Sequence, residues 1–144
     1  MISNNYSNRL FGRTRGRSKK KINLKKYYQT VDKYKFQNCD KKINYILDIG
    51  TGYGETSIFL ANQFLDKVII SCEKYIDGNI ILLKNIEKNE IKHILLHNGN
   101  VYDVLENIHR ECFDLVWIFF PDPWPKNKPA KRSLITSDFL IKIH

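Results

Sequence analysis

The sequence lacks long hydrophobic runs and has few cysteines. No apolar stretch approaches the roughly 20 residues that a membrane-spanning helix needs, and no secretory signal precedes the charged N-terminal segment. Cys39, Cys72 and Cys112 are odd in number and form no C-x-x-C motif, so we expect free thiols in a reducing compartment. Cys72 lies in an apolar run and is expected to fill the core. These absences predict a cytoplasmic protein without a membrane anchor.

Metal-ligating clusters are also missing from the sequence. His93 and His97 are four residues apart, but the residues between them are apolar and no third ligand is in view. We therefore predict no metal site. The length of 144 residues fits one domain with its own core.

Acidic residues are scarce at the N-terminal end. Residues 1–42 contain 13 Lys and Arg against two Asp, a net charge of +11, whereas residues 43–144 contain 11 against 13, a net charge of −2. We therefore divide the chain into a basic N-terminal arm, 1–42, and a domain, 43–144. Such an arm is typical of contacts to phosphate backbones, and the alternative is a solubilising tail.

The domain alternates strand and helix patterns with short joints, which predicts an α/β fold with a parallel sheet. The segment 24–36 is compatible with a basic helix or with an extended aromatic arm. Thr136 or Ser137 is expected to cap the last helix. The predicted strands are 43–49, 67–72, 93–97 and 113–120, and the predicted helices are 55–64, 76–88, 101–108 and one that begins near Asp138.

The first strand ends in a glycine-rich turn that leads into a helix. Gly50, Gly52 and Gly54 allow positive φ and close approach of a ligand to the backbone. The spacing does not match the dinucleotide fingerprint G-x-G-x-x-G, and Asp48 would repel a pyrophosphate. The pattern therefore disfavours a dinucleotide-binding oxidoreductase. Glu73 ends the second strand, where a carboxylate accepts both hydroxyls of a ribose.

The fourth predicted strand, 113–120, consists mainly of aromatic and branched residues, which indicates burial on both faces. The prolines of Pro121-Asp122-Pro123-Trp124-Pro125-Lys126 end it. Ligands of open α/β sheets bind beyond the carboxyl ends of the strands. A topological switch between the first and fourth strands would bring Asp48, the glycine turn and Asp122 to one crevice.

The glycine turn, Glu73 and the Pro121–Lys126 motif together resemble the S-adenosylmethionine-dependent tRNA (guanine-N7) methyltransferases. The segment 11–17 also resembles the arginine-rich opening of this family. The resemblance implies a Rossmann-like methyltransferase sheet with a basic N-terminal arm. It also implies methylation of guanine 46 in the tRNA variable loop. The family continues beyond this point for further strands, so the resemblance implies a sheet that is incomplete on its C-terminal side.

The resemblance also assigns site residues. Asp122 corresponds to the residue of the active site, and Asn100 falls where the family usually has Asp, facing the adenine. The implied cofactor contacts are Asp48, Gly50, Gly52, Gly54, Glu73, Asn100 and Asp122; the implied substrate contacts are Lys126, Trp124, Arg13, Arg15 and Arg17. Trp124 offers a face for an extruded base or packs under its loop.

Two other hypotheses about the function remain open at this point. One is a truncated, catalytically inactive remnant that binds RNA or cofactor. If the sheet is incomplete, a second polypeptide or C-terminal fragment is a possible partner that completes it. The other is a methyltransferase of exocyclic amines, whose typical Asn-Pro-Pro-aromatic string is absent from the sequence.

Overall fold

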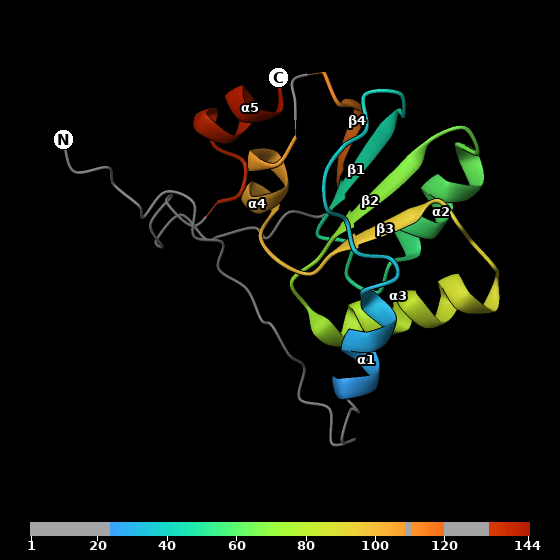
Figure 1. Cartoon of the computed structure of the whole chain (residues 1–144). Helices are drawn as coiled ribbons and strands as arrows, with labels where there is room; N and C mark the ends of the chain where they lie inside the picture. The colour runs from blue at the N-terminus through green and yellow to red at the C-terminus, as the bar shows by residue number, and fades with distance from the viewer. Residues whose placement is uncertain (1–23, 109–110, 120–132) are drawn as a thin grey trace.

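The computed structural model describes residues 24–108, 111–119 and 133–144. In these ranges strands and helices alternate after a first short helix, as the α/β pattern predicts (Figure 1). The elements are α1 (Leu24–Val31), β1 (Tyr45–Ile49), α2 (Glu55–Gln63), β2 (Val68–Cys72), α3 (Ile76–Lys88), β3 (Ile94–His97), α4 (Val101–Glu106), β4 (Phe113–Ile118) and α5 (Ser137–Ile143).

The described strands form one parallel sheet in the order β3-β2-β1-β4. β1 pairs with β2 on one side and with β4 on the other. The predicted switch between the first and fourth strands is therefore confirmed. Because all strands run in the same direction, their carboxyl ends meet at one edge of the sheet.

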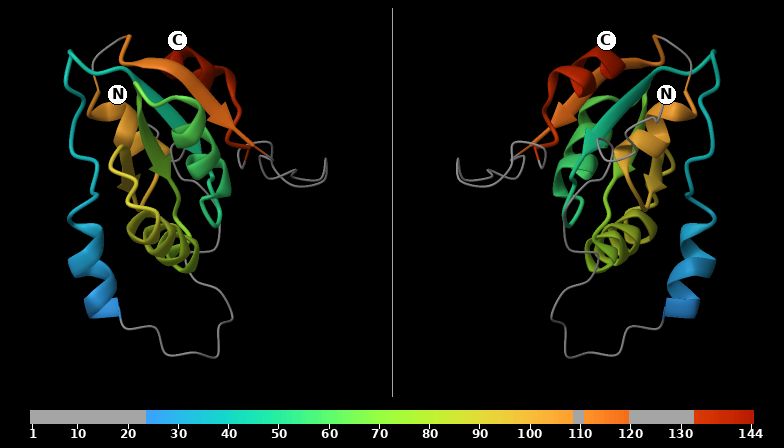
Figure 2. Two further views of the ribbon diagram at one scale, coloured as in Figure 1. Left: turned by 90° about the vertical axis from the view of Figure 1, so that its right-hand side faces the viewer. Right: turned by 90° about the vertical axis from the view of Figure 1, so that its left-hand side faces the viewer.

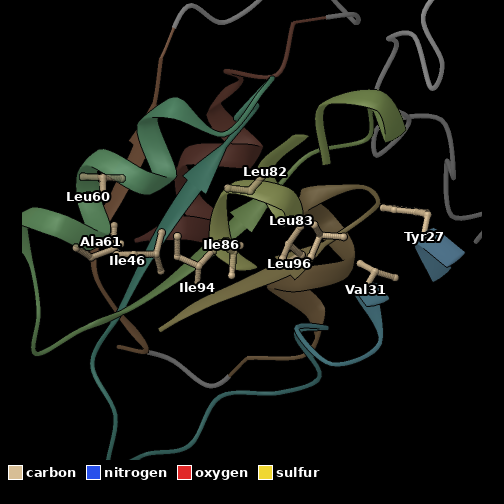
Figure 3. Packing of buried hydrophobic residues seen from close by; sticks show 11 residues of the cluster. Tyr27, Val31, Ile46, Leu60, Ala61, Leu82, Leu83, Ile86, Ile94 and Leu96 are labelled. Atoms are coloured by element: carbon tan, nitrogen blue, oxygen red, sulfur yellow. The ribbon is translucent and has the colours of Figure 1, made fainter. Parts of the chain in front are cut away.

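Helices cover both faces of the sheet (Figure 1). Side chains alternate along β1, so Ile46 faces one layer, and Leu47 and Ile49 face the other. The first layer contains α1, α2 and α3, whose apolar side chains form one cluster with Ile46. In Figure 3, Ala61 of α2 lies beside Ile46, whereas Tyr27 and Val31 of α1 lie at the other end of the cluster. The second layer contains α4 and α5, where Tyr102 and Phe139 meet edge to face at 5.9 Å.

The segment 24–36 is helical up to Val31 and then forms a turn over residues 32–34, so the helical alternative holds for its first part. Tyr27 and Val31 on α1 are buried against the first layer. Lys35 then forms a parallel bridge with Leu96 of β3. The segment after α1 therefore lies along the β3 edge of the sheet, and β4 forms the opposite edge (Figure 2). The division of the chain at residue 42 stays a prediction.

β4 is less buried than the sequence predicts. Every residue of β1 is buried, whereas β4 is only partly covered and its Asp114 is exposed. The prediction of burial on both faces was wrong for β4, because β4 is the last strand of the described sheet and has one neighbour there. An apolar composition alone does not distinguish a central strand from an edge strand.

The prediction of three free thiols was also wrong. Cys39 and Cys112 form a disulfide across 73 residues of sequence, with their Cα atoms 6.8 Å apart. The fold brings them together at the start of β1 and β4. The backbone N–H of Asp40, next to Cys39, donates to the Tyr45 hydroxyl at 3.0 Å, and Tyr45 pairs with Phe113, next to Cys112. Cys72 is free and buried in the second layer, as predicted.

α5 begins as the sequence predicts. The Thr136 hydroxyl oxygen accepts a hydrogen bond of 3.1 Å from the Phe139 backbone N–H, and Thr136 is therefore the N-cap. In the three described ranges, no helix has both the length and the hydropathy to cross a lipid bilayer.

Candidate functional site

The carboxyl edge of the sheet joins the ends of three neighbouring strands by backbone hydrogen bonds. The Gly50 N–H donates to the Cys72 carbonyl at 2.9 Å, which ties the turn after β1 to the end of β2. The Glu73 N–H donates to the His97 carbonyl at 3.1 Å, which ties β2 to β3. The predicted site residues on these turns are therefore held together by the sheet itself.

The glycine turn has the backbone conformation that its sequence predicts. Gly50, Gly52 and Gly54 have φ angles of 75°, 56° and 83°, all in the left-handed region that favours glycine. At Gly54 a Cβ would also lie 2.6 Å from the Leu82 Cδ1 atom. α3 therefore packs directly against this turn.

Gly78 on α3 makes the closest approach to the turn. A Cβ at Gly78 would lie 1.9 Å from the Gly52 carbonyl oxygen, so no other residue fits at this position without displacement. Gly78 was not predicted as a functional position. The signal was present, since an isolated glycine inside a helical pattern often marks close packing.

Glu73 connects the turn to the start of α3. Its Oε2 accepts a hydrogen bond from the Gly52 N–H, and its Oε1 accepts one from the Tyr75 N–H, both at 2.8 Å. The Tyr53 and Tyr75 rings meet edge to face at 5.9 Å beside these bonds. Each carboxylate oxygen keeps a second lone pair for a ligand. Glu73 thus both shapes the turn and presents an acceptor at its side.

Asp48 lies beneath the turn and is fully buried. Its Oδ2 accepts a hydrogen bond of 2.7 Å from the Ser57 hydroxyl on α2, whereas its Oδ1 has no hydrogen-bond partner. Burial raises the pKa of the Asp48 carboxyl to about 6, against the opposing effects of the Ser57 and Thr56 hydroxyls. A buried oxygen without a hydrogen-bond donor lowers the stability of the folded state, and a donor on a ligand would restore the missing hydrogen bond.

Asn100 has a structural role at the end of β3. It is the N-cap of α4, where its Oδ1 accepts a hydrogen bond of 3.1 Å from the Tyr102 N–H, and Asp103 completes a capping box. From the sequence, Asn100 was predicted only as a cofactor contact. The motif Asn-x-x-Asp before an apolar helix would have indicated the cap.

Asn79 is a buried polar residue of α3 that was not predicted to have a role. Its Nδ2 donates to the Glu73 carbonyl at 2.9 Å and to the Asn98 Oδ1 at 3.2 Å. Asn79 therefore links the turns that follow β2 and β3. Within a helical period, one Asn among apolar residues gives no sequence signal of this role.

A hollow of about 500 Å³ opens on the other side of the glycine turn, between the start of α2 and the end of β4. Gly50 and Thr51 form its floor, and Phe119, which follows β4, contributes to its wall. The remaining lining residues are Tyr53, Glu55, Thr56 and Phe59. Glu73 and Asn100 are not among these lining residues.

Six of the predicted site residues lie outside the described residues. These are Asp122, Trp124, Lys126, Arg13, Arg15 and Arg17. The chain leading to Asp122 is described up to Phe119, which lines the same hollow as Gly50. In the part of the chain that the structure covers, no group of three His, Cys, Asp or Glu side chains is arranged to hold a metal ion.

Comparison with known proteins identifies the family. Residues 42–144 match the model of a family described as "Putative methyltransferase". The tRNA (guanine-N(7)-)-methyltransferase of Neorickettsia sennetsu is 34% identical over 134 residues, which cover 91% of this chain and 60% of that protein. The protein of the same name from Hyphomonas neptunium is 30% identical and is matched over 67% of its length, with 94% of this chain covered.

The fold is shared with solved methyltransferase structures. An rRNA methylase from Streptococcus thermophilus is similar over 88% of this chain and 64% of its own, with a TM-score of 0.50 and 17% identity. The chain spans about 60% of the length of the Neorickettsia relative. The chain therefore belongs to this methyltransferase family, and its sequence relatives there are tRNA (guanine-N(7)-)-methyltransferases.

Proposed function

We propose that the chain binds S-adenosylmethionine at the carboxyl edge of its sheet and directs methylation of N7 of guanine 46 in the tRNA variable loop. The observation that carries this proposal is the hydrogen bond from the Gly52 N–H to Glu73, at 2.8 Å. It joins the glycine turn and the acidic strand end into one cradle, in a chain whose relatives are named tRNA (guanine-N(7)-)-methyltransferases.

The described residues fit this cofactor. Glu73 has remaining lone pairs for two ribose hydroxyls. The unpaired Oδ1 of Asp48 would accept a hydrogen bond from an ammonium or N–H group once the turn above it shifts. Asn100 follows β3 at the same edge of the sheet, and the resemblance assigns it to the adenine, while its amide oxygen caps α4. We therefore assign Asp48, Gly50, Gly52, Gly54, Glu73 and Asn100 to cofactor binding.

The proposed reaction requires orientation more than acid–base chemistry. The cofactor supplies a methyl group on a positively charged sulfur. Guanine N7 carries an in-plane lone pair and no proton, so the chain needs no general base and its residues mainly align the acceptor. We assign Asp122 to the cofactor side of the active site as well, where its carboxylate favours the positive charge that develops on the purine.

The proposed partner is tRNA. Arg13, Arg15 and Arg17 belong to the basic arm, whose net charge of +11 supports contacts to phosphates. Lys126 is assigned to a nearby phosphate and Trp124 to the face of a base. A tRNA substrate argues for a cytoplasmic location, whereas the Cys39–Cys112 disulfide is typical of oxidising compartments.

A methylation assay tests the proposal. The purified chain is incubated with S-adenosylmethionine and tRNA that lacks the modification, and 7-methylguanosine is measured in the digested RNA. We expect Asp122→Ala to abolish the product. Asp114→Ala is the matched control, because Asp114 is an exposed carboxylate of β4 whose ion pair is with Lys67. Full activity of Asp122→Ala would remove Asp122 from the mechanism.

The same assay distinguishes an enzyme from an RNA-binding remnant. It is repeated with the C-terminal portion of a longer relative added as a second polypeptide, because the chain spans about 60% of the Neorickettsia protein. Product that forms only with this addition supports a second polypeptide that completes the site. Salt-dependent tRNA binding without product under either condition would instead support a non-catalytic RNA-binding protein.

A further inference from the structure

The hollow beside the glycine turn is lined by exposed aromatic rings. Tyr53, Phe59 and Phe119 are 51%, 53% and 52% exposed, and they come from the turn, from α2 and from the end of β4. Among the described residues, the two exposed phenylalanines are both in this hollow. Half-exposed aromatic rings from three separate segments therefore gather at one place.

The rings have a firm support. The Trp117 and Phe119 rings are 6.5 Å apart and inclined by 34°, so Trp117 backs Phe119 from the strand side. Phe59 lies on α2, which is anchored below by Leu60 and Ala61 in the fully buried core. Rings held in this way can stack on a flat ligand with little loss of conformational freedom.

Glu55 adds a carboxylate to the same hollow. It lies in the first turn of α2 and its side chain is exposed. The Watson–Crick edge of guanine presents two adjacent donors, N1–H and the N2 amino group, and one carboxylate can accept from both. Adenine presents a lone pair at N1 and would meet the carboxylate unfavourably. The charge of Glu55 therefore complements guanine among the bases.

We propose that this hollow holds the acceptor guanine, turned out of its stack, with Phe59 and Phe119 as stacking faces and Glu55 as the acceptor for its Watson–Crick edge. This inference rests on the proposed function. Methylation at N7 makes the purine cationic, and both aromatic faces and a carboxylate attract a cation. The hollow should accordingly bind 7-methylguanosine more tightly than guanosine, and adenosine most weakly.

Nucleoside binding tests this inference without relying on turnover. The full chain is saturated with S-adenosylhomocysteine and titrated with 7-methylguanosine, guanosine and adenosine, and binding is followed by tryptophan fluorescence and by calorimetry. We expect Phe59→Ala to weaken 7-methylguanosine binding roughly tenfold or more, as is usual for loss of one stacking ring. Glu55→Gln should reduce the preference for guanosine over adenosine.

Matched controls use residues outside the hollow. Tyr28→Ala removes an aromatic ring that is 47% exposed on α1, and Glu87→Gln changes an exposed carboxylate on α3. Both controls should bind nucleosides like the wild type. S-adenosylhomocysteine affinity, measured separately, should be the same in all four variants and would show that each variant is folded.

The outcomes separate this inference from the proposed function. A chain that binds no S-adenosylhomocysteine contradicts the proposed function. A chain that binds it, but whose nucleoside affinities are equal or are unchanged by Phe59→Ala and Glu55→Gln, overturns the guanine site and leaves the cofactor site intact.

Discussion

Asp48 is the one charged side chain in the buried core of the described residues. Burial raises the pKa of its carboxyl to about 6, from 3.8. The folded state therefore binds this proton more tightly than the unfolded state, and the stability that this group contributes is lost as the pH rises from about 4 to about 6. A shift of this size corresponds to at most about 3 kcal/mol in the free energy of unfolding.

The first prediction concerns Asp48→Asn. Asn resembles the protonated carboxyl, so the variant and the wild type should have similar stability near pH 4. Above pH 6 the variant should be more stable, by up to about 3 kcal/mol. Urea unfolding of both proteins at several pH values measures this difference. A difference that is independent of pH would show that Asp48 does not titrate in this range.

A second prediction concerns the end of α3. Glu90 has a φ of 53°, and Ile91 N–H donates to the Ile86 carbonyl at 3.0 Å, which is the hydrogen bond of a Schellman motif. Glycine is favoured at the left-handed position of this motif. Glu90→Gly should therefore stabilise the fold by roughly 0.5–1 kcal/mol, since relief of strain exceeds the added chain entropy.

Thermal unfolding of Glu90→Gly measures this gain. Glu87→Gly is its control, because Glu87 lies inside α3, where glycine should instead lower stability by about 1 kcal/mol relative to a good helix former. Equal destabilisation by both substitutions would contradict the assignment of a strained position at Glu90.

At the residue scale the sequence predicted Asp48 and Glu73 as site residues but not the side chains that contact them. Asp48 and Glu73 are recognisable because they flank a glycine turn and end a strand. Ser57, which donates to Asp48, and Asn79, which joins two turns, are ordinary residues of helical patterns. Their roles depend on the rotation of each helix against the sheet, which a single sequence does not give.

At the scale of elements, the contact between α3 and the glycine turn shapes the proposed cofactor site. Gly78→Ala would place a Cβ 1.9 Å from the Gly52 carbonyl oxygen, where neither backbone can yield cheaply. We expect α3 to be pushed away, with a loss of at least tenfold in S-adenosylhomocysteine affinity and a clear drop in stability. Calorimetry and thermal unfolding measure the two effects.

Gly50→Ala provides the comparison for this third prediction. A Cβ at Gly50 meets nothing within 4 Å, and the cost comes only from its φ of 75°. That cost is about 1–2 kcal/mol, so the destabilisation should be smaller than for Gly78→Ala. The reverse order would mean that α3 does not pack against the turn as closely as described.

The hydrophobic periodicity predicted the bounds of helices and strands better than it predicted their burial and their contacts with one another. The helical pattern gave α3 with the bounds Ile76–Lys88 that the structure shows. Burial of β4 was overestimated, because an apolar strand looks the same in sequence whether one or two strands flank it. The hollow was not predicted either, since Phe59 and Phe119 are 60 residues apart and meet only through the parallel pairing of β1 and β4.

At the scale of the whole molecule, the disulfide joins the segment before β1 to the start of β4. Cys39→Ser with Cys112→Ser should lower stability by roughly 2–4 kcal/mol, because the bond closes a long loop in the unfolded chain. Unfolding in the presence and absence of a reducing agent should give the same difference for the wild type and none for the double variant.

Counting thiols provides the matching measurement for this fourth prediction. Under denaturing, non-reducing conditions one cysteine, Cys72, should react with an alkylating agent, and after reduction all three should react. Three reactive thiols before reduction would restore the original expectation. That expectation was wrong because pairing across 73 residues depends on tertiary structure, which the spacing of cysteines does not encode.

Leu96 of β3 holds the segment that follows α1 through both of its backbone groups. Its backbone N–H donates to the Tyr34 carbonyl at 2.7 Å, and its carbonyl accepts from the Phe36 N–H at 2.8 Å. The amide of Leu96 can exchange with deuterium only when the segment after α1 detaches from β3. The hydrogen-exchange rate of this single amide therefore measures how often the segment containing Tyr34 and Phe36 separates from β3.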